Sequence, residues 1–390
     1  MLDHRAGAKS APLLTTPFLL VCLATGLFYL SFYLLLPGLP LYVKGLGGTP
    51  AQLGLMFGYY ASMAMLLRLP GGWLIDRRGS RPILLTGMAI FMLASLSYIA
   101  VGSVPAILAL RLFHGAGMGL FPTAATVVVA ELAPPERRGE AMGWFGFANS
   151  MAMILGPMVG AFVAQRLGFS PLFLVAAGSA ALGLACLLPL PTRRVLPSGG
   201  PAFRVRSLVS PAAVFPSALL LFLCAPYGTL MAFGPILAVH RGLGNPGLFF
   251  TVFAAAMLLV RAKAGEVSDR RGRIAAILPG MLLAAAGLAC LALTDTPMLL
   301  LVGAGVYGLG LGGAQPALMA LAADRVPLPD RGKAMGTFYT AWELGIASGS
   351  SASGWLLGSL AFPPVLLGCA LLPAIGAFLS LGGRRGKTRF

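Results

Sequence analysis

Three of the ionisable side chains inside long apolar runs of this sequence, where a charge is costly, are candidates for proton chemistry: Glu343, Arg111 and His114. If its run is helical, Glu343 lies about 18 Å from Arg331, near which the run begins. An acid at such a depth in a membrane is a candidate for binding and releasing a proton. The alternative is a carboxyl that stays neutral and hydrogen-bonds to a neighbouring helix.

Arg111 and His114 share one run. Arg111 lies about 9 Å inside it, where an unpaired arginine costs several kcal/mol, so the side chain should face a polar cavity or cap backbone carbonyls. His114 follows one turn later on roughly the same face, and imidazole titrates in the range of a proton relay. A neutral histidine packed in the wall fits the sequence equally well.

A second group of charges occurs twice, 193 residues apart. Gly72–Gly79 returns as Gly265–Gly272, and no insertion breaks the register between Arg68/Arg261 and Gly156/Gly349. We therefore interpret the chain as two copies of one unit. The expected organisation is a first half over 1–191, a linker over 192–212 and a second half over 213–390.

The elements that must position these residues are membrane helices. The chain is 58% hydrophobic and 10% charged, with a mean hydropathy of +0.87, whereas soluble domains carry about 25% charged residues. A helix needs about 20 apolar residues to cross the hydrocarbon. Twelve runs qualify: 17–41, 51–74, 82–102, 105–130, 140–165, 171–191, 213–238, 247–267, 275–294, 297–322, 334–358 and 363–383.

The basic residues predict the orientation of these spans. Of 28 lysines and arginines, 21 fall on the side that holds both termini, three on the other side and four within spans. This bias places both termini in the cytoplasm and the protein in the cell (inner) membrane. The net charge of +17 lies in short turns, which argues against a nucleic-acid partner. We expect no cleavable signal peptide, and the five cysteines are small apolar fillers.

The loop after the second run reads Gly72-x-x-x-Asp76-Arg77-x-Gly79-x-Arg81, and its weaker copy follows the eighth run. This pattern resembles the signature of the major facilitator superfamily in the same loop. The resemblance covers the whole chain and implies an all-α membrane fold with twelve helices in two pseudo-symmetric six-helix bundles.

In that family the loop forms a latch that closes the cytoplasmic side. Gly72 would let helices two and eleven approach closely, and Asp76 would meet the N-terminus of helix eleven. Arg77 and Arg81 would reach acids at the end of helix four, with Glu131 the natural partner. The other reading is that these arginines only set the topology. In the weaker copy the latch would use Asp269 and Arg270, although its last arginine, Arg273, comes one residue early.

The fifth run contains Gly156-Pro157-Met158-Val159-Gly160. It resembles, in degraded form, the Gly-Pro motif of proton-driven exporters in the superfamily, which favours export over uptake. Gly156 and Gly160 would give a close helix contact and Pro157 a bend. The same residues could equally serve ordinary packing.

Aromatic residues on several runs are candidates for lining a substrate cavity, although such stripes more often serve packing or an interface belt. They are Tyr29, Phe32, Tyr33, Tyr59, Tyr339 and Trp342. The duplicated Arg68 and Arg261 are expected to snorkel or to brace the latch.

The function that the resemblance implies is a secondary transporter, namely a proton-coupled exporter of an amphipathic small molecule. Its expected partners are that substrate, protons and the lipid bilayer. An uptake symporter or uniporter for a small organic solute shares the same topology. A membrane enzyme or a receptor is disfavoured, because the three histidines lie far apart and neither would need a duplicated latch. We expect a monomer without metal or cofactor.

Overall fold

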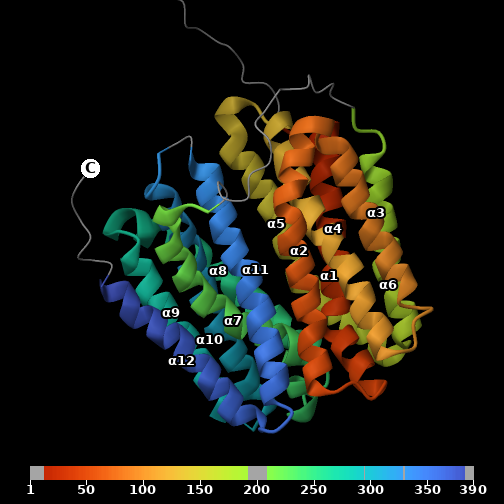
Figure 1. Cartoon of the computed structure of the whole chain (residues 1–390), viewed down its shortest axis with the longest axis vertical. Coiled ribbons are helices and arrows are strands. Elements are labelled where there is room, and N and C mark those ends of the chain that lie inside the picture. The colour runs from red at the N-terminus through yellow and green to blue at the C-terminus, as the bar shows by residue number, and fades with distance from the viewer. Residues whose placement is uncertain (1–12, 192–208, 294, 328–329, 383–390) are drawn as a thin grey trace, which may run out of the picture.

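A computed structural model describes residues 13–191, 209–293, 295–327 and 330–382, without the side chains of Leu69, Asp76 and Pro135 (Figure 1). Most of the expected linker lies outside these residues. The described residues form helices and no strand, so the predicted all-α class is confirmed for them. The α-helices are α1 (Thr16–Gly45), α2 (Pro50–Arg78), α3 (Ser80–Ser97), α4 (Val104–Leu132), α5 (Arg138–Arg166), α6 (Phe169–Leu187), α7 (Pro211–His240), α8 (Gly247–Arg271), α9 (Ile274–Leu293), α10 (Pro297–Asp324), α11 (Arg331–Leu356) and α12 (Phe362–Gly382), with a 3₁₀ turn, η1 (Pro135–Arg137), before α5.

Each expected span coincides with one of these helices, although the ends differ. Helices such as α1 extend beyond the apolar run, since α1 ends at Gly45 and the expected run ends at residue 41. Conversely, α3 ends at Ser97, five residues before the expected end of the run 82–102. The chain turns there through short hydrogen bonds from Ile99 N to Leu96 O (3.1 Å) and from Ala100 N to Ser97 O (3.1 Å). These turn residues are apolar, so hydropathy did not mark the end.

Ten of the helices are long and apolar enough to cross a membrane. The two that do not meet this measure are α2 and α11. Both contain several glycines, α11 is also rich in serine and threonine, and each carries a charge inside its length: Arg68 on α2 and Glu343 on α11. They pack against each other. The two helices that miss this measure therefore pack against each other between the two halves of the chain.

The helix contacts follow the duplication. In the first half α1 packs on α5 and α6, α2 on α4, and α3 on α4 and α6. In the second half α7 packs on α11 and α12, α8 on α10, and α9 on α10 and α12, which is the same pattern six helices later. Across the halves, α2 contacts α11 and α5 contacts α8 (Figure 1).

The same register appears at the level of single atoms. A Cβ built on Gly115 would meet the backbone of Tyr60, and one built on Gly308 would meet the backbone of Phe253. Each second-half residue lies 193 positions after its counterpart. The glycines thus allow two helices to pack backbone to backbone at equivalent places in both halves. The pairs Gly119–Ala64 and Gly312–Met257, and Gly117–Gly87 and Gly310–Gly280, repeat the correspondence.

The helices alternate in direction, so the turns fall at two ends of the molecule. We call the end with the turns after α2, α4, α8 and α10 the basic end, and the end with the turns after α1, α5 and α7 the opposite end. Gly79 and Gly272, both with φ of 88°, end α2 and α8 at the basic end. Only a residue without a Cβ adopts this conformation without strain.

The two halves touch closely toward the opposite end. A Cβ on Gly54 of α2 would meet the backbone of Ser350 and Gly354 on α11. Between α5 and α8, Thr251 Oγ1 donates to Ile154 O (2.7 Å). Gln165 Nε2 donates to Gly244 O (2.9 Å) and Asn245 Nδ2 to Met158 O (3.2 Å) beyond it.

Candidate functional site

The centre of the site is an ion pair between the halves. Arg68 Nη2 on α2 donates to Glu343 Oε1 on α11 at 2.7 Å. The Glu343 side chain is 8% exposed and that of Arg68 20%. The guanidinium also lies over the ring of Tyr339, 5.3 Å from its centroid. Tyr339 and Glu343 are four residues apart on α11, so one helix face presents a carboxylate and a ring to the same cation.

This arrangement differs from the expectation that Arg68 snorkels or braces the latch. Arg68 lies ten residues before the end of α2 and Glu343 twelve residues after the start of α11, which places them at similar depths, about 15 and 18 Å from the basic end. Two opposite charges buried at one depth stabilise each other, whereas either alone would be costly. The matching depths were the available signal for the pair.

Several of the aromatic candidates lie around this centre. On α1 the rings of Tyr29 and Tyr33 stack at 6.3 Å, and Phe32 stacks on Tyr60 of α2 at 5.4 Å. On α11 the ring of Trp342 packs 5.7 Å from Tyr227 of α7, a residue that the sequence did not single out.

Tyr59 is separated from the other candidates. It lies nine residues before Arg68, which is half a turn out of phase on a helix with 100° per residue. It shares a face of α2 with Leu66, and the two side chains are 37% and 60% exposed. The structure therefore directs Tyr59 to the outer surface of the helix and not toward the ion pair.

Arg111 and His114 on α4 are brought together, as their spacing predicts. Arg111 is 2% exposed; its Nε donates to Met56 O (3.2 Å), and its guanidinium lies 4.0 Å from the ring centroid of Tyr60. Arg111 Nη1 lies 3.5 Å from His114 Nδ1, and Tyr98 Oη lies 3.3 Å from the same nitrogen.

Arginine is only a donor, so a hydrogen bond from Arg111 to Nδ1 of His114 requires Nδ1 to accept, which is the tautomer with its proton on Nε2. Nε2 is buried without a partner in the described structure, as are Arg111 Nη2 and Tyr60 Oη. Nδ1 of His114 and Nε of Arg111 therefore have hydrogen-bond partners, whereas three other polar atoms of the cluster have none in the described structure. It contains no direct contact with Glu343 in the described residues.

At the basic end the structure departs from the expected latch. No described atom lies within 4 Å of a Cβ built on Gly72, so α2 and α11 do not approach closely there. Their close approach is at Gly54 and Gly58, because these glycines face Ser350, Ser351 and Gly354. The side chain of Asp76 lies outside the described residues.

The other residues of the first copy make contacts within the first half of the chain. Arg77 stacks on Trp73 of its own helix (4.3 Å), and Arg81 Nη2 donates to Leu188 O (2.6 Å). Glu131 accepts a hydrogen bond from Ser80 Oγ (3.4 Å), which ties the start of α3 to the end of α4.

The second copy forms a complete charge cluster. Arg273 Nε donates to Asp324 Oδ2 (2.8 Å), and the same guanidinium contacts Asp269. The hydrogen bond to Asp324 raises the pKa of Arg273; the smaller burial penalty opposes this effect and the bond to Asp269 reinforces it. Arg270 pairs with Glu266 on the same helix (3.1 Å). Asp324 is the counterpart of Glu131. Arg273 contacts Asp269 on α8 and Asp324 on α10, so it links these two helices although it comes one residue early in the repeat.

The helix-five motif packs as its glycines suggest. Cβ atoms on Gly156 and Gly160 would meet Tyr33 and Leu34 of α1. The carbonyl of Pro157 faces Gly247 at the start of α8. The motif thus contacts one helix of its own half and one of the other half.

Comparison with known proteins agrees with this architecture. The family model described as Major Facilitator Superfamily matches residues 21–261 and 246–389, which is most of the chain. The chain belongs to the Major Facilitator Superfamily. This superfamily member is therefore a multi-pass membrane transporter and not an enzyme.

The individual relatives share only a modest sequence identity with this chain. The superfamily member is 25% identical to the inner membrane transport protein YajR of Escherichia coli (strain K12) over 89% of its own length and 78% of that protein. It is 31% identical to the quinolone resistance protein NorA of Staphylococcus aureus, over 36% of each chain. Among solved structures, the nucleoside transporter NupG matches with a TM-score of 0.80 at 16% identity, covering 96% of this chain and 100% of that one. At this identity the match speaks for the fold alone.

Proposed function

We propose that this protein is a proton-coupled exporter that moves an amphipathic small molecule out of the cell by alternating access. Its twelve helices would form two pseudo-symmetric bundles, 1–191 and 213–390, joined by the linker 192–212. It would act as a monomer in the inner membrane with both termini in the cytoplasm. The equivalent helix contacts in the two halves support two bundles that rock about a shared centre.

The Arg68–Glu343 ion pair is the observation that carries the proposal. A proton that binds Glu343 removes the negative charge facing Arg68 and weakens the contact between α2 and α11. Because these helices belong to different halves, the protonation state of one carboxyl biases how the halves sit against each other. Arg111 and His114 form a second candidate for the proton route, through the unsatisfied Nε2 and Nη2 atoms.

The end at which the two halves are in close contact supports a proposal for the side from which the substrate enters. The tight contacts of Gly54 with α11 and of Thr251 with α5 support closure toward the opposite end. In the proposed cycle, the basic end faces the cytoplasm and admits the substrate between the halves. Substrate binding would then release the proton of Glu343 and strengthen the contact between α2 and α11. Gly72 would approach α11 while Asp76, Arg77 and Arg81 with Glu131, and Asp269 with Arg270, hold the basic end shut and the opposite end opens. A proton that enters from the opposite end would return the protein to its first state, so protons move inward as substrate moves outward.

The direction of transport rests on two weaker observations. The helix-five motif resembles that of proton-driven exporters, and the partial relative NorA is named for quinolone resistance. The rings of Tyr29, Tyr33, Tyr339 and Trp342 around one ion pair suit an amphipathic substrate with an aromatic or apolar body.

Ethidium efflux from preloaded cells tests the proposal. Glu343→Gln should slow efflux by about tenfold or more, the size of one lost coupling interaction. Glu140→Gln is the matched control, because Glu140 is an exposed acid that pairs with Arg137 at the basic end. Equal efflux in the wild type and Glu343→Gln, with Glu140→Gln unchanged, would refute the proton role of Glu343.

Counterflow in proteoliposomes separates export from uptake. For an exporter that exchanges protons, an imposed pH gradient drives substrate toward the acidic compartment. Accumulation away from the acidic compartment would instead establish the uptake symporter. Insensitivity to the gradient, with exchange retained, would establish a uniporter.

A further inference from the structure

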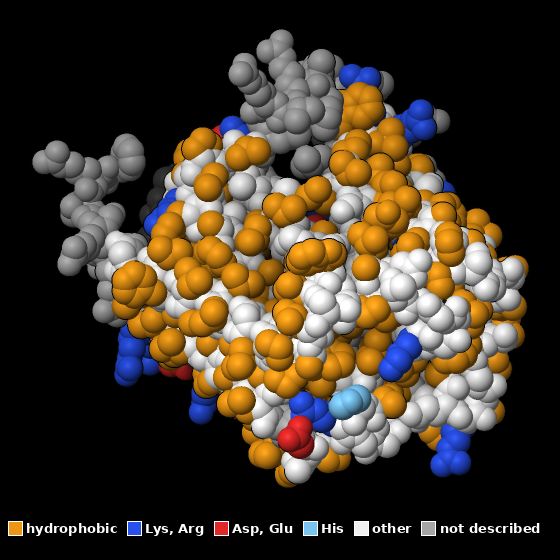
Figure 2. All heavy atoms as spheres, turned by 60° about the horizontal axis from the view of Figure 1, so that its bottom comes forward, with side chains coloured by type: hydrophobic (Ala, Val, Ile, Leu, Met, Phe, Trp, Pro, Cys, Tyr) orange, Lys and Arg blue, Asp and Glu red, His pale blue; other side chains and the backbone are white. Residues whose placement is uncertain are grey.

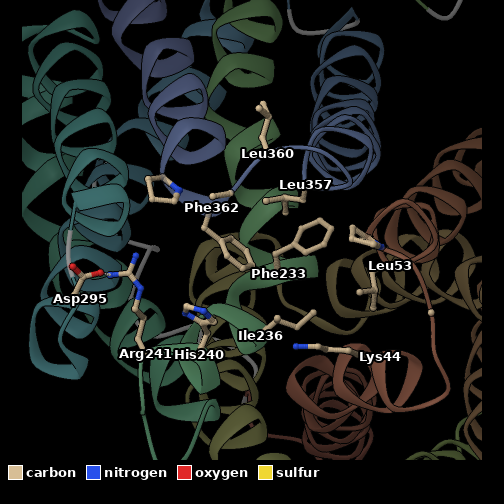
Figure 3. Close-up of a pocket in the computed structure, with 14 residues that line it drawn as sticks. Lys44, Leu53, Phe233, Ile236, His240, Arg241, Asp295, Leu357, Leu360 and Phe362 are labelled. Carbon is tan, nitrogen blue, oxygen red and sulfur yellow. Dashed lines mark hydrogen bonds and ion pairs between the residues drawn. The ribbon is translucent and has the colours of Figure 1, made fainter.

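A cavity lies away from the ion pair, at the opposite end of the molecule (Figure 3). Its volume is about 630 Å³, within the range of about 300 to 1,000 Å³ that accommodates drug-sized ligands. The walls come from both halves. Lys44 at the end of α1 and Leu53 of α2 face Phe233 and Ile236 of α7, and the turn between α11 and α12 completes the rim.

The floor of this outer pocket is apolar and tightly packed. Leu53 and Phe233 are each 3% exposed and Ile236 7%, so they cannot be in bulk solvent. Phe362 and Leu360 extend the apolar wall toward the rim. Such a floor takes the non-polar body of a ligand and releases water on binding.

The rim is cationic. The Lys44 side chain extends into the pocket toward Ile236 and His240 (Figure 3). No ion pair of Lys44 is present among the described residues, whereas Arg241 is paired with Asp295 at 2.7 Å. Asp295 is therefore already neutralised by Arg241, and Lys44 leaves the pocket with one uncompensated positive charge. Figure 2 shows basic, acidic and histidine side chains gathered on this face of the molecule.

We propose that the outer pocket binds an amphipathic organic anion, whose apolar body rests on Leu53, Phe233 and Ile236 and whose acidic group meets Lys44. The assignment concerns binding and does not depend on which substrate the protein transports. Because Lys44 and Leu53 belong to one half and Phe233 and Ile236 to the other, the anion contacts both halves at once. Occupancy therefore stabilises the conformation that is closed at this end.

The experiment uses the full chain in nanodiscs of zwitterionic phosphatidylcholine, with empty nanodiscs subtracted. The probe is 1-pyrenebutyrate, and its neutral counterpart is 1-pyrenebutanol. We expect saturable binding of the butyrate and at least about tenfold weaker binding of the alcohol, as for loss of one partly desolvated charge contact. Equal binding of both probes, or no saturable binding of the butyrate, overturns the proposal.

Three variants locate the site. Lys44→Glu should weaken pyrenebutyrate binding about tenfold or more, and Leu360→Trp should obstruct the rim at a side chain that is 46% exposed, where folding is not at risk. Arg166→Glu is the matched control, since Arg166 is an exposed cation at the same end outside the pocket. Equal losses in Lys44→Glu and Arg166→Glu would mean non-specific attraction and overturn the assignment.

Hydrogen–deuterium exchange tests the bridging of the halves. Pyrenebutyrate should slow exchange in both turns that form the rim, 45–49 and 357–361. Protection of one turn alone would refute contact with both halves. Binding is measured here without any transport, so a failure of the proposed transport mechanism is distinguishable from a failure of this site.

The same chemistry could come from an anionic lipid or from a free organic acid. Short-chain dihexanoyl phosphatidylglycerol, compared with dihexanoyl phosphatidylcholine, separates the two. Competition by dihexanoyl phosphatidylglycerol alone identifies the lipid headgroup as the source of the anion. Absence of competition by either lipid, with pyrenebutyrate still bound, identifies a free amphipathic acid.

Discussion

The Arg68–Glu343 contact is the clearest case of two residues whose roles depend on each other. Each would be a costly buried charge alone, and the pair places them at 2.7 Å with little solvent access. Pairing also explains why a carboxylate can persist in an apolar run. The residue that could bind a proton is thus also one that holds two helices together.

Removing one partner should cost more than removing both. We expect Arg68→Gln to lower the free energy of unfolding by about 3 kcal/mol, because Glu343 is left buried and unpaired. The double variant Arg68→Gln/Glu343→Gln should recover most of this loss. Denaturation in mixed detergent micelles measures the cycle, and simple additivity of the two single changes would contradict the pairing.

The contribution of Arg111 to stability depends on the planar shape of its guanidinium as well as on its charge. The planar guanidinium stacks on Tyr60 while its Nε donates to Met56 O. Arg111→Lys should therefore lose about 1 to 3 kcal/mol of unfolding free energy, since an ammonium cannot make both contacts. The control Arg166→Lys, at an exposed helix end, should change it by less than about 0.5 kcal/mol. Equal stability of both variants would show that the stack contributes nothing.

Among the helices, close packing depends on glycine at a few positions. Gly160 of α5 faces the backbone of Leu34 on α1, while Gly178 of α6 has nothing within 4 Å of a built Cβ. A methyl group therefore has no room in the first case and open space in the second.

Gly160→Ala should accordingly destabilise the protein by about 1 to 3 kcal/mol through overpacking. Gly178→Ala should leave the stability unchanged or raise it by up to about 1 kcal/mol, because it only adds helix propensity on an open face. Thermal unfolding monitored by a thiol-reactive dye would compare them. A loss in Gly178→Ala as large as in Gly160→Ala would refute the contact as the cause.

For the whole molecule, the charge asymmetry between the two ends predicts how it sits in the membrane. The positive bias of the basic end favours the cytoplasm for the turns after α2, α4, α8 and α10. Arg78 and Arg166 are both exposed and lie at opposite ends.

A membrane-impermeant maleimide applied to intact cells tests this orientation. Arg166→Cys should be labelled at once, whereas Arg78→Cys should be labelled only after permeabilisation. The parent chain provides the background from its five native cysteines. The reverse pattern would invert the orientation and with it the proposed direction of substrate entry.

Much of the architecture follows from the linear order of residues. Apolar runs mark the helices, and the repeated loops mark the duplication, because both depend on local composition and on short-range spacing. Helix ends were less certain at positions such as Ile99, where apolar residues continue through a turn. The proximity of Arg111 and His114 was predictable for the same reason, because a separation of three positions on one helix places two side chains on the same face.

The pairing of Arg68 with Glu343 is different, because 275 residues separate them and only the packing of α2 on α11 brings them together. Tertiary structure also decided that Tyr59 faces outward, that Gly54 rather than Gly72 makes the close contact, and that Lys44 enters a pocket shared by both halves. Local patterns determine which side chains each helix carries on each face. Which helices contact each other depends on how the two halves pack, and no local pattern in the sequence encodes contacts between residues so far apart.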